Sequence, residues 1–186
     1  IVLDREVEYK LGKEILQFYT NTDSLSWDVM PQYLDLITDI GFAIGQAKSR
    51  KHFVDHHTCP VFSYLFTYWS PRAMSAFTLP LGTPEKAAQF LGSGASHGDE
   101  LGCLFKSNMP EMPYIPPTED DWIFMKKMLK AWTAFAKSGN PNCKDLGVSW
   151  EPNDGYLEMG PVWKFHNGVS FAQRIAFWEK MYGKYS

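Results

Sequence analysis

The sequence predicts a mixed α/β fold, in which helices surround a small buried β-sheet. The run 61–69 is apolar on both faces, as expected of a strand covered by helices on both sides. Segments with the helical spacing of apolar residues precede and follow it. Short strand candidates at 156–159 and 162–165 lie between the last two helical segments. Because these strands are too few for an open sheet, we expect the chain to complete a sheet whose other strands lie upstream.

The predicted helices cover residues 6–19, 24–50, 118–138 and the C-terminal segment that Ser170 caps. Thr118 and Asp121 resemble a capping box at the start of the third helix. The side chains expected to face inward are Leu34, Ile37, Ile40, Ile44 and Ala47 on the second helix, Trp122, Met125, Leu129, Trp132 and Phe135 on the third, and Phe171, Ile175, Trp178, Met181 and Tyr185 on the last.

The composition favours a globular protein and excludes several partners. Hydrophobic residues make up 45% of the 186 residues, and the net charge is −3. This balance gives no reason to expect nucleic acid or an anionic membrane as a partner. No apolar run approaches the ~18 residues that span a bilayer. The 3 cysteines are too widely spaced for a disulfide framework, and the missing initiating Met suggests a piece of a longer protein.

Residues 94–98, Gly-Ala-Ser-His-Gly, match the G-x-S-x-G pattern of a nucleophile elbow, which places a serine between a strand and a helix. The preceding residues instead predict a short helix over 84–91 and then a loop. An elbow also needs an acid and a histidine downstream, where His166 alone remains, in a predicted turn. We therefore do not expect Ser96 to be the nucleophile, although a small independent domain that uses Ser96 is an alternative hypothesis.

His97 is the stronger candidate for chemistry on this loop. A neutral imidazole can take the proton of a serine on another loop and later return it to a leaving alcohol. The small residues 94–96 and 98 leave room for the ring and for a substrate. Asp99 and Glu100 are expected to begin the following helix, where acidic groups suit the positive helix end. From these residues alone, an ordinary loop histidine stays an open interpretation.

The histidine-rich segment 52–57 raises the question of a metal site. His52 and His56 are four residues apart and would share a helix face, as zinc ligands can, with Asp55, His57 or Cys59 as a third ligand. No H-E-x-x-H or C-x-x-C pattern supports this interpretation. Histidines near a helix C-terminus are also stabilised by the helix dipole. We therefore expect no metal site.

Several segments in the same order resemble type-B carboxylesterases and cholinesterases. The matching segments are Gly94-Ala-Ser-His97-Gly-Asp-Glu-Leu101 for the family's histidine loop, 60–68 for the core strand before it, 132–141 for a helix end with Gly-Asn-Pro, and 150–152, 156–160 and Phe177-Trp178 for the terminal segment. The resemblance covers most of residues 35–182. Several signatures in order are far more specific than any single one.

The resemblance implies the C-terminal portion of an α/β-hydrolase fold, with the last core strands plus packing helices, and residues 1–186 as the C-terminal part of a single domain. It implies ester hydrolysis by a Ser-His-Asp/Glu triad in the full-length protein, with His97 as the catalytic histidine. Since the chain order of that fold is Ser, acid, His, the nucleophile and the acid are expected upstream. The implied partners are a small-molecule ester and the upstream remainder of the protein, without a cofactor. The implied location is secreted or the endoplasmic reticulum lumen.

Two positions refine the resemblance. Cholinesterases carry a disulfide from the middle helix to the last helix, and Ile44 and Ile175 align with its two ends. An apolar pair can fill that space, so the chain is more similar to carboxylesterases. Asp39 resembles an aspartate that the family carries on this helix, and we assign it no catalytic role. The alternative function is that of non-catalytic adhesion or binding proteins of the same fold, which can keep the histidine loop without the serine.

Overall fold

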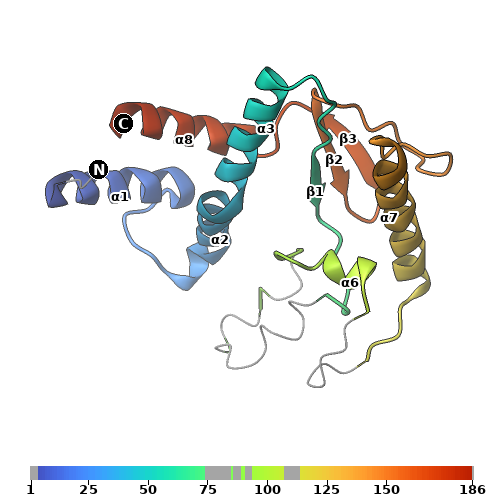
Figure 1. The fold of residues 1–186 in the computed structure, drawn as a ribbon. Coiled ribbons are helices and arrows are strands. Elements are labelled where there is room, and N and C mark those ends of the chain that lie inside the picture. The colour runs from blue at the N-terminus through green and yellow to red at the C-terminus, as the bar shows by residue number, and fades with distance from the viewer. Residues whose placement is uncertain (1–3, 74–84, 86–88, 91–93, 107–113, 186) are drawn as a thin grey trace. The chain divides into compact units, whose positions relative to one another are not determined.

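A computed structural model describes residues 4–73, 85, 89–90, 94–106 and 114–185 of the chain (Figure 1). The chain divides into two compact units, one formed by Ile1–Ser49 with Phe171–Ser186 and the other by Arg50–Ser170. The prediction that all residues belong to a single domain stays a prediction. Among the described residues, none of the helices has both the length and the apolar character that crossing a bilayer requires.

The first unit is helical. Its elements are α1 (Arg5–Thr20), the short helix η1 (Trp27–Val29), α2 (Met30–Thr38), the π-helical turn η2 (Asp39–Ala43), the start of α3 (Ile44–His56), and α8 (Ala172–Tyr185). The Asp4 side chain caps α1 by accepting the Glu6 N–H, and Asn21 ends the helix in a left-handed conformation with φ 56°. The helix predicted over 6–19 is therefore confirmed, while the one predicted over 24–50 begins later and continues to His56.

The apolar core of the first unit joins the middle helices to α8. Its buried members are Ala43, Ile44, Ala47, Ile175, Trp178 and Met181. Ile44 and Ile175 lie in one cluster, as expected of an apolar pair at aligned positions. Leu34, Ile37 and Ile40, in contrast, are 45–56% exposed, so the predicted inward stripe is wrong over this stretch. The π-helical turn explains the difference, because its wider turn shifts the phase of the helix at Asp39–Ala43.

A buried polar network crosses the same unit. Asp39 is fully buried, and its Oδ2 accepts the Tyr19 hydroxyl at 2.5 Å and lies 2.9 Å from Arg174 Nε. The Trp178 indole N–H donates to the Tyr19 oxygen at 2.7 Å. Burial raises the pKa of the Asp39 carboxyl, and the Tyr19 hydrogen bond and the Arg174 charge oppose that rise. Asp39 therefore joins side chains of α1 and α8, which lie side by side (Figure 1).

The second unit contains a three-stranded sheet of order β1-β2-β3. Its strands are β1 (Tyr64–Phe66), β2 (Gly155–Met159) and β3 (Trp163–Asn167), and its further helices are α6 (Leu101–Leu104) and α7 (Glu119–Ser138). β1 runs parallel to β2, with Leu65 opposite Glu158, and β2 runs antiparallel to β3, with Leu157 opposite Phe165. The strand predictions at 156–159 and 162–165 are confirmed to within two residues of their ends.

The strand predicted over 61–69 is shorter than expected, because regular pairing covers Tyr64–Phe66 alone. Hydrogen bonds to the β2 segment nevertheless extend from Val61, whose carbonyl accepts the Asn153 N–H, to Thr67, whose N–H donates to the Met159 carbonyl. Among the described residues, β1 has a strand partner on one side and forms an edge of the sheet. Tyr64 is 40% exposed, so the prediction that both faces are covered is wrong for this side chain.

α7 packs its buried face on this sheet (Figure 1). The capping box of Thr118 and Asp121 is confirmed, and Gly139 ends the helix with φ 72°. The buried side chains Phe124, Met128 and Ala131 define the inner face, whereas Trp122, Leu129 and Phe135 are 44–49% exposed. The predicted stripe is thus displaced by about one residue, although Met125 and Trp132 do pack against the core. α7 is apolar on neighbouring faces, so spacing alone does not select the face that is buried.

The choice of face can be tested on adjacent residues of α7. Met128 is fully buried and Leu129 is 44% exposed. We expect Met128→Ala to lower the free energy of unfolding by about 2–5 kcal/mol, through lost burial and a residual cavity. Leu129→Ala, the matched control, should cost less than about 1 kcal/mol. Urea unfolding followed by circular dichroism measures both, and a larger loss at Leu129 would contradict this packing.

The buried network of the first unit makes a second prediction. Tyr19→Phe removes the hydroxyl that donates to Asp39 and accepts from Trp178. Because this leaves buried polar groups unpaired, we expect a loss of about 1–3 kcal/mol in unfolding free energy. Tyr9→Phe on the same helix, where the side chain is 64% exposed, should change it by less than about 0.5 kcal/mol. Equal effects of the two substitutions in denaturant titrations would argue against the network.

Candidate active site

His97 lies at the tip of a tight turn that leads into α6. The Asp99 N–H donates to the Ser96 carbonyl at 3.2 Å, and the Leu101 N–H donates to the Gly98 carbonyl at 3.1 Å. Gly98 has φ 86°, in the left-handed region that favours glycine. The His97 side chain is exposed, whereas Gly98 is buried behind it. The local sequence therefore forms a compact turn that presents an imidazole at the surface of the second unit.

Asp99 lies beneath this turn and was not identified by sequence reasoning as part of it. Its carboxylate is 2% exposed, and Oδ2 accepts the Ser96 N–H at 2.7 Å. Asp99 and Glu100 were expected to begin a helix, but they belong to the turn and α6 begins at Leu101. The sequence signal that could have identified this contact is the Ser-x-x-Asp spacing of residues 96–99. In this spacing, the Asp side chain can accept the N–H of the Ser three residues before it.

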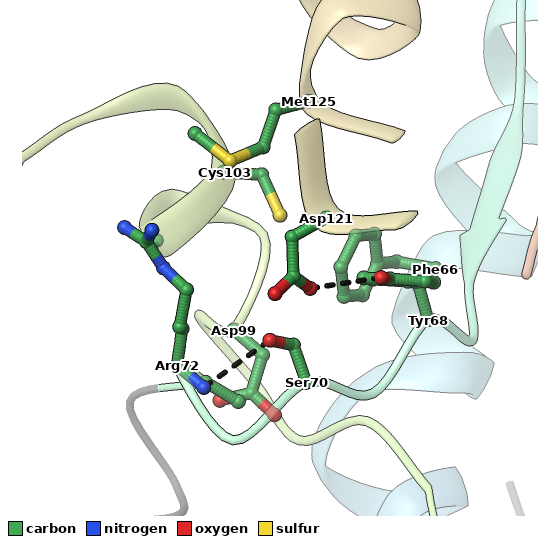
Figure 2. Close-up of a pocket in the computed structure, with 10 residues that line it drawn as sticks. Phe66, Tyr68, Ser70, Arg72, Asp99, Cys103, Asp121 and Met125 are labelled. Carbon is green, nitrogen blue, oxygen red and sulfur yellow. Dashed lines mark hydrogen bonds between the residues drawn. The ribbon is translucent and has the colours of Figure 1, made fainter. Parts of the chain in front are cut away.

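A small pocket lies under the turn (Figure 2). Its lining residues are Phe66, Tyr68, Ser70, Arg72, Ala73, Asp99, Gly102, Cys103, Asp121 and Met125. The space inside has room for about one water molecule. Asp99, Asp121 and Arg72 line it from three separate segments. The pocket therefore supports the turn and is too small to hold an ester substrate.

Asp121 is the second carboxylate of this pocket and is 3% exposed. Oδ1 accepts the Tyr68 hydroxyl at 2.8 Å (Figure 2), and Oδ2 accepts the Thr118 N–H at 2.9 Å. Burial by itself raises the pKa of Asp121, but hydrogen bonds from Thr118, Ser70 and Tyr68 outweigh it, so the pKa lies below its ordinary value. Asp121 is thus a stably ionised group whose acceptor atoms are occupied.

Cys103 also faces this pocket. Burial, with the negative charges of Asp121 and Asp99, raises the pKa of the Cys103 thiol to about 11. A thiol with this pKa is protonated at neutral pH and is a poor nucleophile. The pocket therefore offers no thiolate for covalent catalysis.

Ser96 does not have the setting of a nucleophile elbow. No strand lies between β1 and Ser96 among the residues that the structure describes there. The helix predicted over 84–91 falls largely outside the described residues. His166 was predicted in a turn and instead lies on β3, where its Nε2 is 2.9 Å from Glu158 Oε2. Among the described residues, Ser96 therefore has no strand before it, and His166, downstream of it, already pairs with Glu158.

The histidine segment at the end of α3 forms a stacked pair. The rings of His52 and His56 lie 4.5 Å apart, and His56 Nδ1 is 2.9 Å from the His52 carbonyl oxygen. Asp55 instead pairs with Lys51 at 2.5 Å. Within the described part of the chain, no three His, Cys, Asp or Glu side chains gather as a group that could hold a metal ion.

The fold and the turn together define a chain of mixed helices and strands, in which an exposed histidine follows the first strand of a parallel pair. The chain belongs to the carboxylesterase family, whose family model matches residues 3–178. This match bears out the resemblance drawn from the histidine loop and its flanking segments.

Known proteins similar to this chain are esterases. Esterase E4 of Myzus persicae is 26% identical over 151 residues, which are 81% of this chain and 26% of that protein. Carboxylesterase 1D of Rattus norvegicus is 28% identical over 162 residues, 82% of this chain and 24% of that protein. Cocaine esterase of Homo sapiens is 35% identical over 89 residues, 46% of this chain and 15% of that protein. The chain thus spans about a quarter of the length of the first two relatives.

The lowered pKa of Asp121 predicts an acid-dependent loss of stability. A carboxyl with a lowered folded-state pKa contributes stability that is fully present above its unfolded pKa, about 4, and is lost as the pH falls through the folded value. Asp121→Asn removes this contribution, so its unfolding free energy should fall less steeply below about pH 4 than that of the wild type. At neutral pH we expect it to be lower by about 1–3 kcal/mol.

Asp120→Asn is the matched control for this measurement, because Asp120 lies in the same helical turn and is exposed. Denaturant titrations at several pH values should give this variant the acid slope of the wild type. An unchanged acid slope in Asp121→Asn would show that the Asp121 carboxyl does not carry this linkage.

Proposed function

We propose that the full-length protein that carries this chain hydrolyses carboxylic esters, with His97 as its catalytic histidine. Membership of the carboxylesterase family supports ester hydrolysis as the reaction. The observation that carries the assignment to His97 is its position, exposed at the tip of a turn that Gly98 and Asp99 fix. We also propose that the chain is the C-terminal portion of an α/β-hydrolase fold, with last core strands and packing helices.

In this proposal a serine and an acid upstream of the chain complete a Ser-His-Asp/Glu triad. The imidazole of His97 takes the serine proton as the serine oxygen bonds to the ester carbonyl carbon. It then gives that proton to the departing alcohol, which leaves an acyl-serine intermediate. Water attacks the acyl carbon of this intermediate with His97 again as the base, and the carboxylic acid product is released from the serine. The substrate class is a small-molecule carboxylic ester, and no cofactor takes part.

Hydrolysis of a chromogenic ester tests this function. Since subtilisin loses about 10⁶-fold in kcat when its histidine is removed, we expect His97→Ala in the full-length protein to lower kcat by at least about 10³-fold. His166→Ala is the matched control, because His166 lies in the same unit and already pairs with Glu158. It should stay within about threefold of the wild type. Full activity in His97→Ala would sink the assignment.

The same assay separates the two alternatives. A folded full-length protein that hydrolyses no ester would favour the non-catalytic adhesion or binding function. Activity in the 186-residue chain by itself would instead point to Ser96, because the proposed nucleophile and acid lie outside this chain. We expect the chain alone to show no hydrolysis above the rate in buffer.

A further inference from the structure

We infer that Asp99 is a positioning residue for His97, because its buried carboxylate holds the two ends of the turn that carries the imidazole. This inference rests on the proposed function and adds to it a residue that does not touch the reacting atoms. Asp99 acts through the backbone of residues 96–98, and its contribution is a hydrogen-bond acceptor rather than a charge directed at the substrate.

The geometry closes a ring around His97. The Asp99 carboxylate accepts the Ser96 N–H at 2.7 Å, and the Asp99 N–H donates to the Ser96 carbonyl at 3.2 Å. These reciprocal bonds join the residue before His97 to the residue after Gly98. The length of 2.7 Å is at the short end of the ordinary range for an N–H···O hydrogen bond. The backbone of His97 therefore has little freedom to rotate while both bonds are present.

The burial of Asp99 indicates that it does more than shape a surface turn. Ser96 and His97 are exposed, whereas Asp99 is 2% exposed. Taking a carboxylate out of water is costly unless hydrogen bonds and opposite charge offset the loss of hydration. The Ser96 N–H provides such a bond to the Asp99 carboxylate.

The framework beneath the turn is connected to the rest of the second unit. The Gly102 N–H donates to the Asp99 carbonyl at 3.2 Å, which ties Asp99 to the first turn of α6. A Cβ on Gly102 would lie 3.3 Å from the Arg72 carbonyl oxygen, so α6 packs closely on the segment after β1. Asp99 thereby fixes the turn relative to α6 and β1, instead of leaving His97 on a freely moving loop.

The size of the effect follows from what positioning contributes to catalysis. A misplacement of about 1 Å at a reacting group can cost roughly 10²-fold in rate. Asp99→Ala removes the side-chain acceptor and leaves the Ser96 N–H without it. Asp99→Asn keeps an oxygen, Oδ1, that can accept the same N–H, and it removes the charge. The pair of variants therefore separates the role of the acceptor from that of the charge.

The experiment uses the full-length protein and a chromogenic ester. We expect Asp99→Ala to lower kcat about 10- to 100-fold with KM within about twofold, because Asp99 does not contact the substrate. Asp99→Asn should stay within about threefold of the wild type in kcat. Hydrogen exchange of the segment 94–101 should become faster in Asp99→Ala and remain near the wild-type rate in Asp99→Asn.

Asp121→Ala is the matched control, since Asp121 is a buried carboxylate of the same pocket that hydrogen-bonds Tyr68 and Thr118 rather than the turn. It should lower the unfolding temperature and leave kcat per folded molecule within about threefold of the wild type. If Asp99→Ala does not fold, Asp99→Ser replaces it, because serine fills the polar site with a shorter side chain that cannot make the bond at the same length.

The possible outcomes are distinct. A kcat loss in Asp99→Ala no larger than that in Asp121→Ala overturns the inference, and so does an Asp99→Asn variant as impaired as Asp99→Ala. If His97→Ala abolishes activity and Asp99→Ala retains it, the inference about Asp99 fails while the proposed function stands. If His97→Ala is fully active, the proposed function fails and the inference fails with it. Loss of folding alone would not lower kcat in Asp99→Ala with KM nearly unchanged and also leave kcat near the wild-type value in Asp99→Asn.

Discussion

The Asp121 carboxylate joins the start of α7 to the segment that follows β1. One oxygen accepts the Tyr68 hydroxyl, and the other accepts the Thr118 N–H at the helix start. The same side chain thus completes the capping box and connects a helix terminus to the sheet. Phe124, one helical turn further, stacks on the Tyr68 ring at 4.0 Å. The contact between the start of α7 and the segment after β1, on one side of the pocket, depends on this connection.

The pocket under the histidine turn contains two buried carboxyl groups, and their hydrogen-bond partners differ. Asp121 holds a helix and a strand together, and Asp99 accepts an N–H of the turn that presents His97. Neither faces outward, since both are at most 3% exposed. Under the proposed function, the pocket supports the turn that carries the proposed base, His97. Such a framework is what a catalytic group on a loop needs beneath it.

The chain contributes one part of a larger protein's proposed chemistry. The relatives that it matches are about three times as long, and they include esterases from an insect and from mammals. The proposed base lies within the chain, and its proposed proton donor, the serine, lies outside it. The physical role of these residues is therefore to bring an imidazole to a defined place in front of a nucleophile that another segment supplies.

The sequence by itself determined the helices over 6–19 and 118–138, the hairpin strands and the family. Capping residues such as Thr118 and Asp121 act locally, so they can be recognised without a structure. Only the tertiary structure decided which face of α7 is buried, how far β1 pairs, and where the middle helix shifts phase at Asp39–Ala43. These features depend on contacts between distant residues, such as Tyr68 with Asp121 and Asp39 with Tyr19. His97 could be selected from its loop sequence, whereas the burial of Asp99 beneath it follows from packing that periodicity does not encode.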